Sequence, residues 1–258
     1  MGEKSIWIKG RPGSTLARMA YSLYVALGDS MSIDHYPTCD VRGLDLPPAR
    51  LDPLGAASLL FKNDDTRWLE FRNQDLTGTS PGMKLLNLAE DGATIDDVTT
   101  EELARLGHDS SDPGILVTLT VGGNDLLGAL GAGHRLDQAV RRIIERYTEL
   151  VETVREELPN TTLVLTTVYD PTDGTGMLPG LEGHGRLPLE YLDRFNDHIK
   201  AIAAANERTE LADVHRHFLG HGVTATEADQ WYWKRSMIEP NARGASEIRR
   251  VWLRATGL

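Results

Sequence analysis

Polar residues suited to acyl transfer follow the apolar segments of this chain. Residues 28–30 (GDS), 90–93 (EDGA) and 122–125 (GGND) come directly after three such segments. A serine hydroxyl can act as a nucleophile, and backbone N–H groups or an asparagine side chain can stabilise the oxyanion formed on an attacked ester. Histidine is the commonest general base, and His217 and His221 follow a later segment. Together these residue types predict an acyl-transfer site.

An alternation of strand and helix patterns must position these residues. Apolar runs rich in β-branched residues, typical of strands buried on both faces of a parallel sheet, lie at residues 21–27, 83–88, 115–121, 162–168 and 211–214. Helical patterns lie between or after them at residues 94–106, 136–158, 189–205 and 241–253. The alternation predicts a three-layer α/β fold of about five parallel strands with helices on both faces. In such sheets ligands bind beyond the carboxyl ends of the strands, where the polar residues fall.

Local signals refine these boundaries. Thr94 and Asp97 have the spacing of a capping box, and Pro240 is expected to open the last helix. Residues 36–82 are too long for a plain loop, so we expect a helix around residues 54–61 and an insertion that forms a lid. Residues 1–20 are expected to be an irregular lead-in to one domain that spans residues 21–258.

Composition excludes several classes of protein. The 258 residues are 40% hydrophobic and 25% charged, as in globular proteins. The net charge of −11 and the lack of a Lys/Arg run argue against nucleic acid or an anionic membrane as a partner. No apolar run is long enough for a spanning helix, and the single cysteine excludes an internal disulfide. Residues 1–20 lack a secretory pattern, so a cytoplasmic location is expected. The sequence does not set the oligomeric state.

The order of four blocks resembles the GDSL or SGNH hydrolase superfamily. The blocks are GDS at residues 28–30, NLAEDGAT at 87–94, VGGND at 121–125 and PNARGA at 240–245. The resemblance covers residues 21–258 and implies a flavodoxin-like sheet with Ser30 as nucleophile. It also implies an oxyanion hole made by the N–H groups of Ser30 and Gly92 and the side chain of Asn124. Members are esterases, lipases, thioesterases or carbohydrate acetyl-esterases, which implies a small-molecule ester as substrate and no need for a cofactor or a metal.

The general base departs from the family pattern. The family usually carries Asp-x-x-His before the Pro-Asn that opens the last helix, and residues 236–239 are SMIE here. In the preferred interpretation, His217 or His221 supplies the base and Glu239 orients it. In a second interpretation, Glu239 is the base. A helix dipole is expected to lower the pKa of Glu239, and a carboxyl with a lowered pKa matches a serine proton poorly. In a third, catalysis is lost and the cleft binds a ligand.

Other residues have less specific patterns. Asp213, His215, His217 and His221 have a spacing that permits a metal site, as a variant of the third interpretation. Asp29 and Asp125 are expected to anchor their turns. The aromatic run at residues 231–233 is expected to pack in the core rather than wall a pocket.

Overall fold

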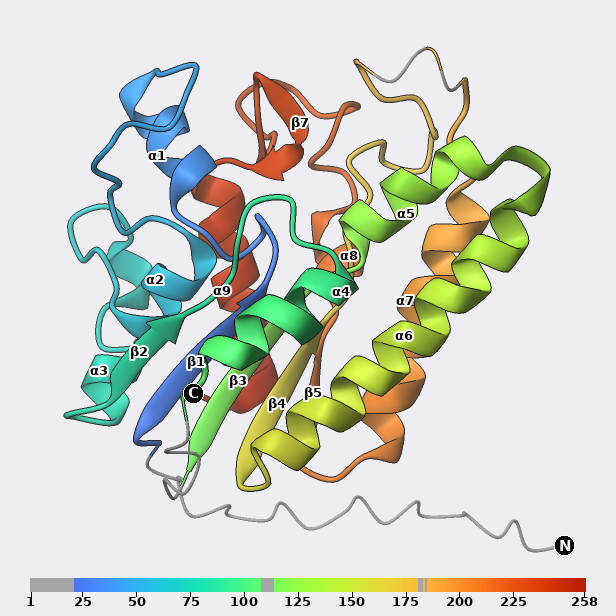
Figure 1. The fold of residues 1–258 in the computed structure, drawn as a ribbon. Coiled ribbons are helices and arrows are strands. Elements are labelled where there is room, and N and C mark those ends of the chain that lie inside the picture. The colour runs from blue at the N-terminus through green and yellow to red at the C-terminus, as the bar shows by residue number, and fades with distance from the viewer. Residues whose placement is uncertain (1–20, 108–113, 181–182, 184) are drawn as a thin grey trace, which may run out of the picture.

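Five parallel strands form the central sheet of the computed structural model, which describes residues 21–107, 114–180, 183 and 185–258 (Figure 1). The strands are β1 Leu23–Gly28, β2 Lys84–Asn87, β3 Ile115–Thr120, β4 Thr161–Thr166 and β5 Thr209–Ala212. Their spatial order is β2-β1-β3-β4-β5, so the predicted α/β sheet is confirmed. The expected lead-in over residues 1–20 lies outside the described residues.

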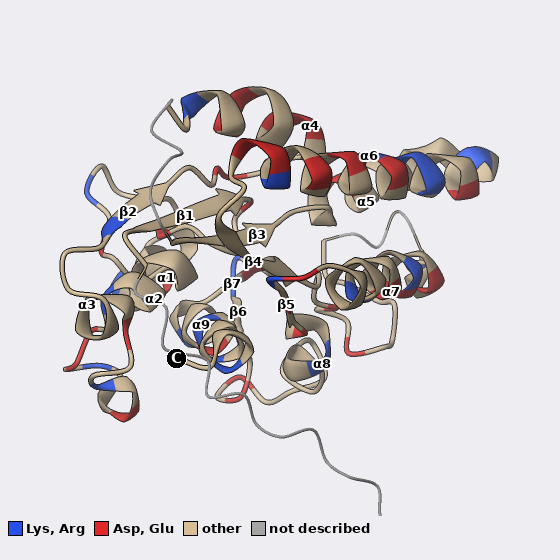
Figure 2. Cartoon of the chain, turned by 90° about the horizontal axis from the view of Figure 1, so that it is seen from below, with Lys and Arg blue, Asp and Glu red and all other residues tan. Residues whose placement is uncertain are grey.

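One face of the sheet is covered by α4 Ile95–Asp97, α6 Leu136–Glu157 and α7 Leu189–Ala205. The chain after α4 continues as two further helical pieces, η2 Val98–Glu102 and η3 Leu103–Arg105. The apolar stripe of α6 packs on strand residues that face it, and charged residues recur along the rest of the helix (Figure 2). The helix patterns at residues 94–106, 136–158 and 189–205 therefore match helical structure.

The other face is covered by α2 Ala56–Phe61 and α9 Ala242–Thr256, with α1 His35–Arg42 and α8 Val214–Phe218 beside them. Trp252 is fully buried against this face, and its indole N–H donates to Thr166 Oγ1 at 2.9 Å. The aromatic residues 231–233 are buried as well, in agreement with the packing role predicted for them.

The segment at residues 36–82 holds α1, α2, η1 Leu69–Phe71 and α3 Leu76–Thr79. Phe71 and Leu76 join the core beneath α9, and the Arg249 guanidinium lies 3.6 Å from the centre of the Phe71 ring. No residue of this segment, all of which the structure describes, lines the apolar pocket beside Ser30. The segment supports α9, and the lid expected of it stays a prediction.

A small hairpin precedes α9. It pairs β6 Tyr232–Trp233 with β7 Ser236–Pro240 in an antiparallel two-stranded sheet that the sequence patterns did not predict. Pro240 ends β7 instead of opening α9, which corrects that expectation. Asn241 is the N-cap of α9, and its side chain accepts a hydrogen bond from Gly244 N at 2.8 Å. The capping box of Thr94 and Asp97 is confirmed.

Of the helices in the described part of the chain, none is long and apolar enough to cross a membrane.

Candidate active site

Ser30 lies in a tight turn at the carboxyl end of β1. Gly28 has φ +119°, and a Cβ at this position would lie 1.6 Å from the Thr120 carbonyl oxygen, so a larger residue cannot replace it. The next residue, Asp29, donates its N–H to the same oxygen at 2.7 Å. The Asp29 side chain accepts from Met31 N at 3.1 Å and thereby anchors the turn, as predicted. Ser30 is held between these two residues with only 8% of its surface exposed.

The three groups expected to form an oxyanion hole are tied together by backbone contacts. The Glu90 N–H donates to the Gly28 carbonyl at 2.9 Å, which fixes the turn that carries Gly92. Gly92 has φ +75°, a conformation that favours glycine. Asn124, in the first turn of α5 Gly123–Ala129, donates from Nδ2 to the Ala93 carbonyl at 2.9 Å. The structure therefore places Ser30, Gly92 and Asn124 at one edge of the sheet.

Asp125 fixes the helix that carries Asn124. Its Oδ2 accepts from Ile95 N at 3.0 Å, and its Oδ1 lies 3.0 Å from the Arg146 guanidinium. These contacts join the starts of α5 and α4, and they agree with the anchoring role predicted for Asp125.

Glu239 lies on β7 and lines the same pocket as Ser30. An interaction with the Ser30 side chain lowers the pKa of the Glu239 carboxyl. The Tyr169 hydroxyl holds the adjacent backbone, because it donates to the Ile238 carbonyl at 2.7 Å. Glu239 Oε2 is buried and has no hydrogen-bond partner among the described residues.

Burial raises the pKa of Glu239 from 4.5 to about 7, although the interaction with Ser30 lowers it and the negative charge of Asp91 raises it further. The expected lowering of this pKa by a helix dipole is wrong. Glu239 lies in β7, two residues before the Asn241 N-cap, and desolvation is the largest cause of its shift. Burial also raises the pKa of Asp29 to about 7, and the neighbouring Glu239 charge adds to this shift.

The two candidate histidines lie elsewhere. His217 Nε2 is 2.8 Å from Glu247 Oε2 of α9. His221 stacks on Trp231 with ring centres 3.5 Å apart, and its Nδ1 is 2.9 Å from the Asp229 carbonyl. The chain enters α8 directly after β5, so His217 lies on α8 against α9, whereas His221 lies in the turn after α8 against Trp231. Neither is among the described residues that line the pocket with Ser30.

The metal-site variant is not supported by this arrangement. Asp213 caps α8 by accepting from Arg216 N at 3.2 Å, and it also accepts from Thr167 Oγ1 at 3.2 Å. His217 and His221 have the separate partners given above. Within the described ranges, no group of three or more histidine, cysteine or acidic side chains is placed to hold a metal ion.

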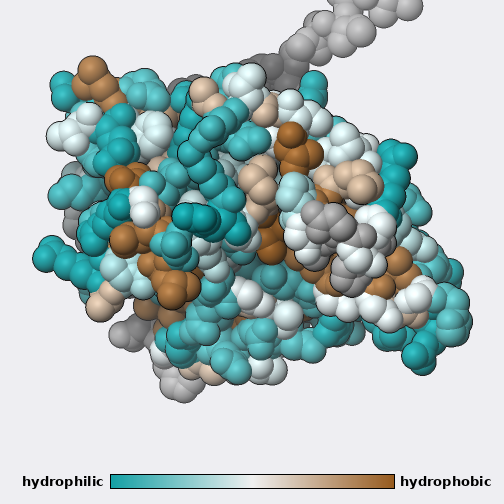
Figure 3. Space-filling view, turned by 90° about the horizontal axis from the view of Figure 1, so that it is seen from above, coloured by the Kyte–Doolittle hydropathy of each residue, from teal (hydrophilic) through white to brown (hydrophobic). Residues whose placement is uncertain are grey.

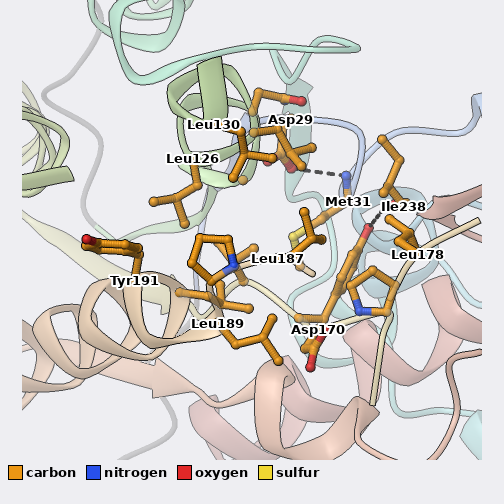
Figure 4. Close-up of a pocket in the computed structure, with 18 of the residues that line it drawn as sticks. Asp29, Met31, Leu126, Leu130, Asp170, Leu178, Leu187, Leu189, Tyr191 and Ile238 are labelled. Atoms are coloured by element: carbon orange, nitrogen blue, oxygen red, sulfur yellow. Dashed lines mark hydrogen bonds between the residues drawn. The ribbon is translucent and has the colours of Figure 1, made fainter. Parts of the chain in front are cut away.

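An apolar pocket of about 120 Å³ extends from Ser30. Asp29, Ser30, Asn124 and Glu239 form its polar end. Its aliphatic walls come from α5, η4 Leu130–Arg135, the segment before α7, and α7 (Figure 4). Apolar residues also reach the surface on this side of the molecule, between polar ones (Figure 3). These walls include Leu126, Leu127, Leu130, Leu178, Leu187 and Leu192.

Sequence reasoning missed this pocket. The only local signal was the group of leucines directly after Asn124, because residues three and four apart share one helix face. The opposite wall comes from residues about sixty positions later, which no local pattern connects to the first.

The buried carboxyls predict an unusual dependence of stability on pH. Glu239 has a raised pKa, so the folded state binds its proton more tightly than the unfolded state, and stability falls as pH rises from about 4.5 through about 7. The raised pKa values of Asp29, about 7, and Glu102, about 8, also make stability fall as pH rises. We expect Glu239→Gln to reduce the fall in the free energy of unfolding between pH 5 and pH 8 by about 2 kcal/mol. Urea denaturation at the two pH values measures this change.

A matched control for that measurement is Glu152→Gln, which changes an exposed carboxyl on α6. It should leave the fall in stability as large as in the wild type. Equal pH dependence in wild type and Glu239→Gln would contradict the buried, protonated state of Glu239.

Comparison with known proteins gives one family and several similar folds. The model of the GDSL-like lipase/acylhydrolase family matches residues 26–246. An extracellular lipase from Streptomyces rimosus is 18% identical with a TM-score of 0.59, covering 91% of this chain and 99% of that one. A phospholipase A1 from Streptomyces albidoflavus NA297 is 22% identical with a TM-score of 0.57, and the match covers 92% of this chain and 100% of that one. An acetylxylan esterase from Geobacillus stearothermophilus is 15% identical with a TM-score of 0.60, covering 93% and 97%. No curated protein sequence matches the chain.

Proposed function

Because the chain belongs to the GDSL-like lipase/acylhydrolase family, we propose that it hydrolyses a small-molecule ester with Ser30 as nucleophile and Glu239 as general base. The observation that carries this proposal is that Ser30 and Glu239 line the same pocket, where Glu239 is a buried carboxyl whose pKa is about 7. A base works best when its pKa lies near the working pH, and this value meets that condition.

The reaction proceeds in two halves. In the first, Ser30 Oγ bonds to the ester carbonyl carbon while its proton passes to Glu239. The tetrahedral intermediate then loses the alcohol, whose oxygen takes the proton back from Glu239, and an acyl-enzyme is left. In the second half, a water molecule gives a proton to Glu239 and attacks the acyl carbon. Cleavage of the Ser30 ester bond releases the acid and returns the proton to Ser30 Oγ.

The oxyanion that forms in both halves is stabilised by the N–H groups of Ser30 and Gly92 and by Asn124 Nδ2. Support for this assignment comes from the tethers around them. Asn124 Nδ2 donates a hydrogen bond to the Ala93 carbonyl, and the Glu90 N–H donates to the Gly28 carbonyl. These hydrogen bonds restrain the proposed donors before substrate binds. Donors that are fixed in advance stabilise developing charge without reorganisation.

Glu239 is a better candidate for the base than His217 or His221. It interacts with Ser30 directly, whereas His217 is engaged with Glu247 and His221 with Trp231 and the Asp229 carbonyl. A histidine base would require both the loss of those contacts and a movement of α8 or of the loop that follows it. The dyad of Ser30 and Glu239 requires no such movement.

A fluorophosphonate probe tests the nucleophile. Ser30 Oγ should attack phosphorus and displace fluoride, so the wild type should be labelled and Ser30→Ala should not. Ser236→Ala, which alters a serine of β7 on the same side of the molecule, should keep the label. Mass spectrometry of the labelled peptide locates the modified residue. An unlabelled wild type would favour a protein that binds a ligand in this cleft without catalysis.

A further inference from the structure

The apolar pocket beside Ser30 has a defined size and polarity. Its polar end carries Ser30 and Asn124, and the rest of its surface is mainly aliphatic. In Figure 4, Leu126 and Leu130 lie on one side of Leu187, and Tyr191 lies far from Met31, the neighbour of Ser30 in sequence. An ester carbonyl held at Ser30 would therefore direct its acyl chain between the leucines of α5 and those around the start of α7.

The aliphatic walls are incompletely covered by the protein itself. Leu126, Leu127, Leu130, Leu187 and Leu192 are all only half-buried. Apolar surface that stays exposed in the free protein is available for an apolar ligand. Each methylene buried there is expected to improve binding about fourfold, the factor that corresponds to about 0.8 kcal/mol.

The volume of the pocket limits the length of the chain. An apolar cavity of about 150 Å³ is known to hold a benzene molecule, which has six carbons. The present pocket has about 120 Å³. By the same measure it accommodates about five carbon atoms, so a six-carbon acyl group fits with its carbonyl carbon at Ser30.

The charge of the pocket limits the chemistry of the ligand. Asp29, Asp170 and Glu239 contribute carboxyls to its lining. Among the lining residues, all within the described part of the chain, there is no lysine, arginine or histidine to pair with an anion. An anionic group placed here would lose its hydration and gain no opposite charge, which is strongly unfavourable.

We propose that this pocket binds an uncharged, aliphatic acyl group of about six carbons, and that contact with this group selects the substrate. The proposal rests on the proposed ester hydrolysis and narrows it. It predicts discrimination against acetyl esters, whose acyl group is too short to reach the leucines, and against acyl groups that end in a carboxylate.

A chain-length series with wild-type protein is the first test. kcat/KM for p-nitrophenyl hexanoate should exceed that for p-nitrophenyl acetate by about 10²-fold, from four added methylenes at about fourfold each. The p-nitrophenyl monoester of adipic acid has the same chain length but ends in a carboxylate. Its kcat/KM should be at least about 10²-fold below that of the hexanoate. Preference for acetate, or equal rates with the two six-carbon esters, would overturn the proposal.

A filled pocket is the second test. Leu130→Trp should lower the ratio of hexanoate to acetate kcat/KM by about tenfold or more, because the indole occupies volume that the chain needs. The control is Leu46→Trp, at a leucine that is 77% exposed and lies outside the pocket, and it should leave the ratio unchanged. An unchanged ratio in Leu130→Trp would also overturn the proposal.

Binding separates this proposal from the proposed hydrolysis. 1-Hexanol is uncharged and cannot be hydrolysed, so calorimetric titration with it needs no activity. Wild-type protein should bind 1-hexanol more tightly than hexanoate anion, and Leu130→Trp should weaken binding of the alcohol. If the protein shows this binding pattern but cleaves no ester, the proposed ligand of the pocket is supported and only the proposed hydrolysis is contradicted. Ester cleavage without 1-hexanol binding would contradict only the pocket.

Discussion

Glu239→Gln lowers kcat for ester hydrolysis by about 10²- to 10⁴-fold, the range expected when a general base is removed. Glutamine keeps the shape of the side chain but cannot take the Ser30 proton. In the wild type, activity rises with pH through about 7, because only the ionised carboxyl of Glu239 acts as a base. Steady-state kinetics from pH 5 to pH 9 measures both effects.

The pH profile alone does not distinguish a carboxyl with a pKa of about 7 from a free imidazole, so the histidine variants are the control. His217→Ala and His221→Ala should retain the wild-type kcat and the same rise with pH. A large loss in either variant, together with an active Glu239→Gln, would assign the base to a histidine. Urea denaturation of the histidine variants also shows whether loss of the His217–Glu247 contact affects folding.

Asn124→Ala should lower kcat by about 10²- to 10³-fold, as found when one oxyanion donor is removed. KM should change much less, because the oxyanion exists only in the transition state and the intermediates. The substitution also removes the hydrogen bond to the Ala93 carbonyl, so the turn that carries Gly92 becomes less constrained.

Asn124→Asp keeps the shape of the side chain but donates no hydrogen bond at neutral pH, so it should lower kcat as Asn124→Ala does. Asn206→Ala is the control, since Asn206 donates only to the Ile202 carbonyl at the end of α7. It should leave kcat unchanged. Full activity in Asn124→Ala would remove this side chain from the mechanism.

Much of the fold was predictable because its strands and helices are local patterns. The β-branched runs at residues 115–121 and 162–168 correspond to β3 and β4, and the apolar stripe of residues 136–158 corresponds to α6. The position of Ser30 and Asn124 at one sheet edge also follows from strand order alone, because both residues come directly after parallel strands.

The environment of Glu239 was not predictable in the same way. Its neighbours in sequence suggested a helix start and hence a lowered pKa. The pKa is instead raised by burial and by Asp91, which is distant in sequence. His217 and His221 follow the correct strand, yet their directions depend on contacts that are distant from that strand: His217 with Glu247 of α9, and His221 with Trp231. Spacing places a residue at an edge of the sheet, whereas tertiary contacts decide which way its side chain points.

Because Glu239 lies on the hairpin of β6 and β7, it differs from the turn of Ser30 in its tolerance of substitution. Gly28 fixes the nucleophile's turn, since any added carbon there meets the Thr120 carbonyl, and this part of the chain tolerates no variation. Glu239 lies on a strand that pairs only with β6, so its side chain can be exchanged without breaking the five-stranded sheet. The turn of the proposed nucleophile is therefore fixed by the five-stranded sheet, whereas the proposed base lies on a separate hairpin. Such a division allows one fold to work with bases of different chemistry, and hence at different acidities, while the point of attack stays the same.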